Sequence, residues 1–434
     1  MSERGRTLGP WSASALVIAN MVGAGVFTTS GFALADLGRR DVVLAAWAVG
    51  GIVAICGALA YGGLARRFPR SGGEYTFLAQ IFHPFAGFLA GWVSLLAGFT
   101  APIAAAALGL QAYLVFAIGT TFDPRWIGSA AILASGVMHG IRLREGVRLQ
   151  NIAVALKLGL LAGFLTFGLG GILAGGGPPA TEPADGSVAL PGLTAFFASL
   201  VWIYFAYSGW NAAVYVAGEI RDPDRHLARS LLGGTIVVTV LYLALNAVFL
   251  FSTERADLAG QPEVAAIAAR ALGGESLGNV VAIAVALALF TSVSSMVMAG
   301  PRVYEQMAAD GVLPRVLAAG GDTPRVAVFF QVGLALAVVW WADLGELLRT
   351  IGFTLGLCAA AAVFGIFVVR AREGAERLPV PGYPFVPLVF LVSTLGSSAF
   401  LVMRSPREAL VGLLVVVSGA VFYVVSRRFA RPAP

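Results

Sequence analysis

Apolar runs of about twenty residues recur along the whole chain, and they constrain its fold more than any other feature. Hydrophobic residues make up 58% of the 434 residues. Charged residues make up only 12%, against roughly 25% in a typical soluble domain. Because a membrane-spanning helix needs about 20 apolar residues, and no soluble core could bury this much apolar surface, the sequence predicts an all-α integral membrane protein.

Twelve of these runs are predicted to be transmembrane helices. Twenty arginines fall in the connections on the side of the N-terminus and seven on the opposite side. Since cytoplasmic connections carry an excess of basic residues, both termini are expected in the cytoplasm. This bias also explains the net charge of +6, so no nucleic-acid partner is expected. The predicted helices begin near Trp11, Val42, Phe82, Trp126, Val147, Leu193, Leu231, Leu277, Val326, Leu344, Pro384 and Glu408.

The first and sixth predicted helices carry small, flexible residues near their middles. Gly23-Ala24-Gly25 interrupts the first helix, and Ser208-Gly209 interrupts the sixth. Such residues also serve as close-packing positions in membrane helices. Interruptions in corresponding positions of two halves, however, indicate inverted repeats with a substrate site near the middle of the membrane.

A broken helix leaves backbone groups that need partners inside a membrane. The amides from Ala24 to Phe27, at the start of a half-helix, suit a carboxylate. The carbonyls near Met21 and Phe205, at the ends of half-helices, suit an ammonium. A ligand with both groups on one carbon is an α-amino acid, so the two interruptions predict an amino acid site.

Lys157 is the only lysine of the chain, and it lies in the apolar stretch NIAVALKLGLLAGFL. An ionisable residue inside a membrane helix is a functional candidate by default. Unlike arginine, a buried lysine can lose its proton. The alternative is that Lys157 bonds the carbonyls of a broken helix and only stabilises the fold.

Five stretches resemble, in order and spacing, the amino acid–polyamine–organocation (APC) superfamily of transporters, and most closely its L-type amino acid transporter branch and bacterial relatives. They are MVGAGVF, ARRFPRSGGEYTFL, FAYSGWN, GEIRDPDRHLARS and GPRVYEQMAADGVLP. The resemblance covers nearly the whole chain. It implies a LeuT-like fold in which about 11–174 and about 193–370 form two inverted five-helix repeats. Helices one and six are broken, and about 384–426 form two additional helices.

The resemblance also implies alternating access around a site between helices one, three, six, eight and ten. The backbone groups of the substrate would rest on the two broken segments, and Phe205 would close over it. In several relatives a lysine on helix five replaces a sodium ion, so Lys157 would contact carbonyls near Met21 and Val22 and a hydroxyl on helix eight, for which Ser292 fits best. The predicted substrate-binding residues are Met21, Gly23, Ala24, Gly25, Val26, Phe205, Ala206, Ser208 and Gly209.

Three positions in the helices and one loop depart from the family pattern. Gly62 and Gly63 stand near the end of helix two, where relatives often have an acidic residue, so a cytoplasmic gating contact is expected to differ. Ala24 stands where relatives often have serine, which removes a hydroxyl but keeps the backbone amide. Phe249 on helix seven stands where relatives often have tyrosine, so a hydrogen bond is expected to be lost. The loop IGTTFDPRW has no cysteine where the animal L-type transporters bind their ancillary glycoprotein. No disulfide-linked subunit is therefore expected.

The other charged residues suggest simpler roles. Glu74 follows arginines in the sequence and is expected to form an ion pair at a cytoplasmic helix end. Arg349 is expected to reach the outer membrane interface. The outer connection from Ser252 to Ser276 contains PEVAAIAARALGG, which predicts a short helix ending at a glycine. This helix would be either a lid or a surface helix without a role.

The leading hypothesis is a sodium-independent secondary transporter of neutral L-amino acids in a bacterial cell membrane, acting as an exchanger or a proton-coupled symporter. No carboxylate is expected in its site. A carrier of cationic amino acids or polyamines remains open, because part of an aromatic cage is available. A membrane sensor that binds an amino acid without transporting it is a further alternative. No phosphate loop, metal cluster or nucleophile–base pair indicates an enzyme or a cofactor. The cage residues are Trp202, Tyr204, Tyr207 and Trp210.

Overall fold

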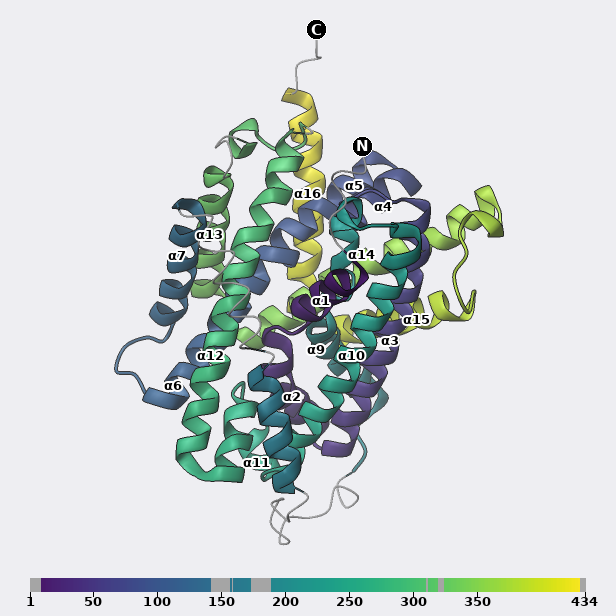
Figure 1. Cartoon of the computed structure of the whole chain (residues 1–434). Helices are drawn as coiled ribbons and strands as arrows, with labels where there is room; N and C mark the ends of the chain where they lie inside the picture. The colour runs from purple at the N-terminus through teal and green to yellow at the C-terminus, as the bar shows by residue number, and fades with distance from the viewer. Residues whose placement is uncertain are drawn as a thin grey trace.

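A computed structural model describes residues 9–141, 157, 159–172, 189–309, 311–318 and 324–429. These residues form a bundle of helices without β-strands. Figure 1 shows α4 (Gly73–Ile81) at one end of the bundle and α11 (Arg255–Leu258) at the other. We call these the α4 end and the α11 end.

Within the described residues, eight helical segments are long and apolar enough to cross a membrane, and nine if the bent pair α1 (Pro10–Met21) and α2 (Ala24–Leu37) counts as one. The helix Gly159–Ile172 and α13 (Arg325–Trp341) are shorter and apolar, and α7 (Arg125–Ile141) is a further helix. The prediction of an all-helical membrane protein is confirmed. The eight segments are Arg40–Arg67 (α3), Pro84–Ile118 (α5 and α6), Leu193–Gly218 (α9 and its continuation), Arg225–Phe251 (in α10), Val264–Glu305 (in α12), Leu344–Glu373 (α14), Phe385–Arg404 (α15) and Pro406–Ser426 (in α16).

The apolar runs alone predicted neither the start of α10 nor the existence of α4. α10 begins at Pro223, well before the apolar run that predicted a start near Leu231. Proline is favoured in the first turn of a helix because its missing N–H is not needed there. The polar residues between Pro223 and Leu231 are also helical, so the helix starts before its apolar segment. The short helix α4, between α3 and α5, was not predicted at all. The predicted start near Val147 lies outside the described residues.

The connection at the α11 end packs onto the bundle. α12 (Val264–Ala309) leaves helical geometry at Gly273 and Gly274, so its first part is a separate short helix, as predicted. Val264 and Ala265 are buried, and the amide of Gly260 donates to the carbonyl of Gly31 in α2. The helix is therefore a packed cover and not a free surface helix.

A charged cluster joins four helices near the α11 end. Arg349 of α14 forms ion pairs of 3.2 Å with both Asp36 of α2 and Glu408 of α16. Its guanidinium lies 4.3 Å from the centre of the Trp202 ring of α9, and the Trp202 indole N–H donates to Asp36 over 3.1 Å. Arg349 therefore does not simply extend to the interface, as its position in the sequence suggested, because two carboxylates from other helices hold it.

We expect Arg349→Leu to destabilise the protein by about 2 kcal/mol or more, because it leaves two partly buried carboxylates without their cation. The measurement is thermal unfolding in detergent. Arg407→Leu is the matched control, since Arg407 pairs with Glu346 over a similar 3.2 Å but is largely exposed, and an exposed pair contributes about 0–1 kcal/mol. Equal losses for the two variants would contradict the prediction.

Candidate functional site

The first helix break lies between α1 and α2. α1 ends at Met21, α2 begins at Ala24, and the two helices are bent by 41°. No side chain caps the first amides of α2. Because these amides carry the partial positive charge of the helix N-terminus, the break presents an uncompensated site for an anionic group.

The second break follows α9 (Leu193–Tyr207). Ser208 has an extended conformation, and Gly209 has a φ of +97°, which L-residues with side chains rarely adopt. The chain then continues as a 3₁₀-helix, Ala212–Glu219. The carbonyl of Phe205 accepts from the amide of Ser208 over 2.9 Å, so this predicted ammonium acceptor already serves the turn.

The two breaks are in direct contact, and glycine allows the close approach. A Cβ on Gly25 would overlap the backbone of Ala206. A Cβ on Gly209 would lie 2.9 Å from the backbone carbonyl of Asn20. The small residues that marked the breaks in the sequence therefore do two things, since they end the helices and let the ends pack together.

Tyr242 of α10 (Pro223–Phe251) joins both breaks. Its hydroxyl donates to the carbonyl of Met21 and also lies 3.2 Å from the carbonyl of Ala206. Phe249, where a hydrogen bond was expected to be lost, is fully buried, and Tyr242 on the same helix supplies hydrogen bonds that the sequence did not predict. Tyr242 lies seven residues, about two helical turns, before Phe249 in α10, and both side chains are fully buried.

Lys157 is 3% exposed, and its ammonium donates to the carbonyl of Val22 in the first break. The carbonyl of Met21, the other expected partner, instead accepts from Tyr242. Ser292 of α12 lines the same cavity as Lys157, but its hydroxyl donates to the carbonyl of Ala288 in its own helix over 3.3 Å. The described contacts therefore tie Lys157 to α1 and leave Ser292 bonded to its own helix.

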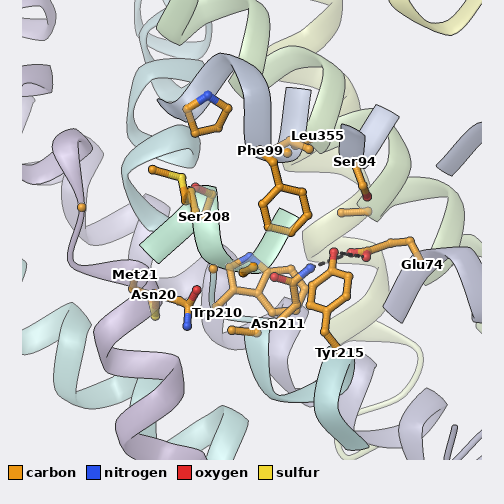
Figure 2. A pocket seen from close by; sticks show the side chains of 18 of the residues that line it. Asn20, Met21, Glu74, Ser94, Phe99, Ser208, Trp210, Asn211, Tyr215 and Leu355 are labelled. Carbon is orange, nitrogen blue, oxygen red and sulfur yellow. Dashed lines mark hydrogen bonds between the residues drawn. The ribbon is translucent and has the colours of Figure 1, made fainter. Parts of the chain in front are cut away.

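A cavity of about 1640 Å³ lies beside the two breaks. Figure 2 shows Met21 and Ser208 on one side of it, and Phe99, Leu355 and Ser94 across from them. Val26 is the one predicted substrate-binding residue absent from its lining, because its side chain, in the first turn of α2, is fully buried by packing. The predicted residues that line the cavity are Met21, Gly23, Ala24, Gly25, Lys157, Phe205, Ala206, Ser208, Gly209 and Ser292.

Glu74 of α4 also lines the cavity and is 5% exposed. Its carboxylate accepts from the Tyr61 hydroxyl over 2.8 Å, from the Asn211 side-chain amide over 2.6 Å, and from the Tyr215 hydroxyl (Figure 2). Among the described residues these neutral donors replace the ion pair that the sequence suggested. A carboxylate therefore lines the cavity, which the sequence did not predict, because α4 turns Glu74 toward the bundle.

The aromatic residues considered for a cation cage do not all meet. Tyr204, Tyr207 and Trp210 line the cavity. Trp202 does not, since it stacks on Phe32 with a centroid distance of 5.0 Å in the charged cluster near the α11 end. Three of the four rings therefore lie at the cavity, and the fourth lies away from it.

Comparison with known proteins agrees with this geometry. Residues 8–424 match the sequence profile of the amino acid permeases. The chain belongs to this family. Two broken helices that meet at a cavity are thus found in a permease that spans a membrane several times.

Three relatives cover almost the whole of this permease. The serine/threonine exchanger SteT of Bacillus subtilis (strain 168) is 27% identical over 98% of both chains. The large neutral amino acids transporter small subunit 2 of Homo sapiens is 27% identical over 96% of this chain and 80% of its own. The Asc-type amino acid transporter 1 of Mus musculus is 26% identical over 95% of this chain and 80% of its own.

We expect Gly25→Ala to reduce transport more than about tenfold, because a methyl group would force the two breaks apart and overpacking typically costs about 1–3 kcal/mol. The measurement is uptake by the purified permease in proteoliposomes. Gly163→Ala is the matched control, since a Cβ on Gly163 of the helix Gly159–Ile172 meets nothing within 4 Å. Wild-type uptake by Gly25→Ala would show that the close approach is not needed.

Proposed function

We propose that this permease is a sodium-independent transporter that exchanges neutral L-amino acids across a bacterial cell membrane. The observation that carries the proposal is the start of α2, whose first amides have no side-chain cap and whose residues Ala24 and Gly25 line the cavity. A substrate carboxylate would accept from these amides. The carbonyls at the adjoining ends of α1 and α9 already accept hydrogen bonds from the protein, but each carbonyl oxygen has a second lone pair that would accept from the substrate ammonium.

A neutral side chain fits the charges around the cavity. The Lys157 ammonium is used by the carbonyl of Val22, and the Glu74 carboxylate already accepts from three neutral donors. Both groups are thus already engaged in hydrogen bonds, which favours a neutral substrate side chain, while Arg70 and Arg302 also line the cavity. The names of the relatives, a serine/threonine exchanger and a transporter of large neutral amino acids, agree with this substrate class.

A carrier of cationic amino acids or polyamines is the second candidate. Glu74 stands on the cavity wall, and Tyr204, Tyr207 and Trp210 line the same cavity. A long cationic side chain could displace the Asn211 or Tyr215 hydrogen bond to reach this carboxylate. The neutral class is favoured because such a substrate would have to break a hydrogen-bonded cluster that is already satisfied.

We further propose twelve membrane spans in the LeuT-like arrangement. Residues 11–174 and 193–370 would form the two inverted repeats, and 384–426 the additional helices. The cavity lining includes Ser12 of α1 and Glu74 of α4, but not the Asp36–Arg349 cluster. With the α4 end and both termini in the cytoplasm, as the arginine distribution favours, this is the inward-facing stage of an alternating-access cycle.

Lys157 would act as a built-in cation. Its ammonium donates to the carbonyl of Val22 in the first break. In this position it would take the place of a sodium ion bound by backbone carbonyls. We also propose that no ancillary subunit is disulfide-linked, because the two cysteines lie in α3 and α14 and not in the connection between α6 and α7.

We expect the purified permease in proteoliposomes to take up labelled neutral amino acids, and to do so equally well with sodium or potassium outside. A panel that includes serine, alanine, leucine and arginine, tested with and without internal substrate and a pH gradient, separates exchange from proton symport. Uptake of arginine but not of leucine or serine would favour the second candidate. Uptake that disappears without sodium would rule out the built-in cation.

We expect Lys157→Ala to lower the transport rate at least about tenfold while the protein still folds, because a lost charge-assisted hydrogen bond costs about 1.5–3 kcal/mol at the break. Transport in proteoliposomes is compared with thermal unfolding in detergent. Thr166→Ala, in the helix Gly159–Ile172 that follows Lys157 in the chain, is the control, since the Thr166 hydroxyl donates to the carbonyl of Ala162 over 2.9 Å. Normal transport by a folded Lys157→Ala protein would leave Lys157 a purely stabilising role.

A further inference from the structure

The third span is widened where it borders the cavity. Residues Ser94–Thr100 form a π-helix between α5 (Pro84–Val93) and α6 (Ala101–Ile118). Pro102 explains it, because proline has no N–H and its ring clashes with the carbonyl four residues earlier, here that of Gly98. π-helical turns are rare and occur often at functional sites.

A buried chain of hydrogen bonds holds this π-helix. The carbonyl of Leu95 accepts from the Thr100 hydroxyl over 2.8 Å and from the Tyr304 hydroxyl over 3.2 Å. The Tyr304 hydroxyl in turn accepts from the side-chain amide of Gln331 in α13 over 3.0 Å. Gly300 makes room for Gln331, since a Cβ on Gly300 would overlap that amide. Gly300 and Tyr304 both belong to the stretch GPRVYEQMAADGVLP, to which the transport site assigns no role.

The π-helix forms the cavity wall opposite the breaks. Ser94, Gly98 and Phe99 line the cavity, and Figure 2 shows Phe99 across from Met21. The wall has room at Gly98, where a Cβ would meet nothing closer than 3.5 Å. Its bulk comes from the Phe99 ring, and the Tyr304 ring packs edge-on against Phe99 with a centroid distance of 6.4 Å.

We propose that Tyr304 is a positioning residue that sets the size of the substrate side chain, by holding the π-helix at Leu95 and the Phe99 ring in the cavity wall. This inference rests on the proposed function, in which the substrate's backbone groups bind at the breaks. Its side chain then extends to the opposite wall. Tyr304 is fully buried and does not line the cavity, so it acts on the substrate only through Leu95 and Phe99.

The test compares alanine with leucine as substrates of Tyr304→Phe in proteoliposomes. Without the hydroxyl, the π-helix loses one of its two side-chain hydrogen bonds at Leu95 and Phe99 can move aside. We expect the alanine KM divided by the leucine KM to rise about two- to tenfold, the equivalent of one hydrogen bond, while kcat changes less. Thr100→Val removes the other hydrogen bond to Leu95 and should shift the ratio in the same direction, which keeps the test decisive if Tyr304→Phe does not fold.

Two further measurements separate positioning from general stabilisation. In a Phe99→Ala background, Tyr304→Phe should no longer change the ratio, because Tyr304 acts on the substrate side chain through the Phe99 ring. Tyr113→Phe is the matched control, since the fully buried Tyr113 hydroxyl also donates to a backbone carbonyl, that of Phe27 over 2.7 Å, and it should leave the ratio unchanged.

An unchanged ratio in folded Tyr304→Phe and Thr100→Val proteins would overturn the inference while leaving the transport proposal intact. A shift that persists in the Phe99→Ala background would overturn it as well. A wild-type protein that transports neither alanine nor leucine would instead refute the proposed function itself.

Discussion

Backbone groups released by two broken helices inside an apolar bundle determine where polar side chains are needed. A carbonyl without a partner is costly in such surroundings. The Tyr242 hydroxyl contacts the carbonyls of Met21 and Ala206, and the Lys157 ammonium donates to the carbonyl of Val22. Neither side chain belongs to a broken helix. The first amides of α2 receive no side chain. The carbonyls are therefore largely satisfied by the protein, whereas the amides remain for a ligand, and this difference makes the start of α2 the anchor of the proposed site.

The same constraint explains the opposite wall of the cavity. Pro102 prevents a regular α-helix in the third span, and the resulting π-helix is held by hydroxyl groups from its own turn and from α12. Both walls thus combine irregular backbone with fixed hydrogen-bond partners. A rigid wall of this kind can distinguish substrates by size, whereas an irregular segment without partners could adapt to any of them.

The sequence was sufficient to predict features that depend on residues adjacent in the chain. It was not sufficient for features that depend on which face of a helix meets its neighbours. Composition indicated the membrane class, and Gly23, Gly25 and Gly209 correctly marked the breaks. Their own chemistry was sufficient, because glycine allows both a helix end and a close contact. Tyr242 and Glu74 were missed, since nothing in a one-dimensional pattern shows which face of α10 meets the breaks or that a short unpredicted helix turns a carboxylate inward. The functional roles of Lys157 and Ser292 stay predictions.

The charged groups at the two ends of the bundle are held by different kinds of interaction, and this matters for the proposed cycle. Near the α11 end, Arg349 is shared between Asp36 of α2 and Glu408 of α16. If α2 moves away from α14 when the α11 end opens, Arg349 loses Asp36 but retains Glu408, so the cation keeps a partner. Asp36 loses its cation and keeps the Trp202 indole N–H as a hydrogen-bond donor. At the α4 end, Glu74 is held by neutral donors, of which Asn211 and Tyr215 lie beyond the second break. Movement of that segment would break the two hydrogen bonds from these neutral donors, and the Glu74 carboxylate would keep the hydrogen bond from the Tyr61 hydroxyl. Arg349 and Glu74 thus each keep at least one partner on an element that does not move, which lowers the cost of separating the elements at either end.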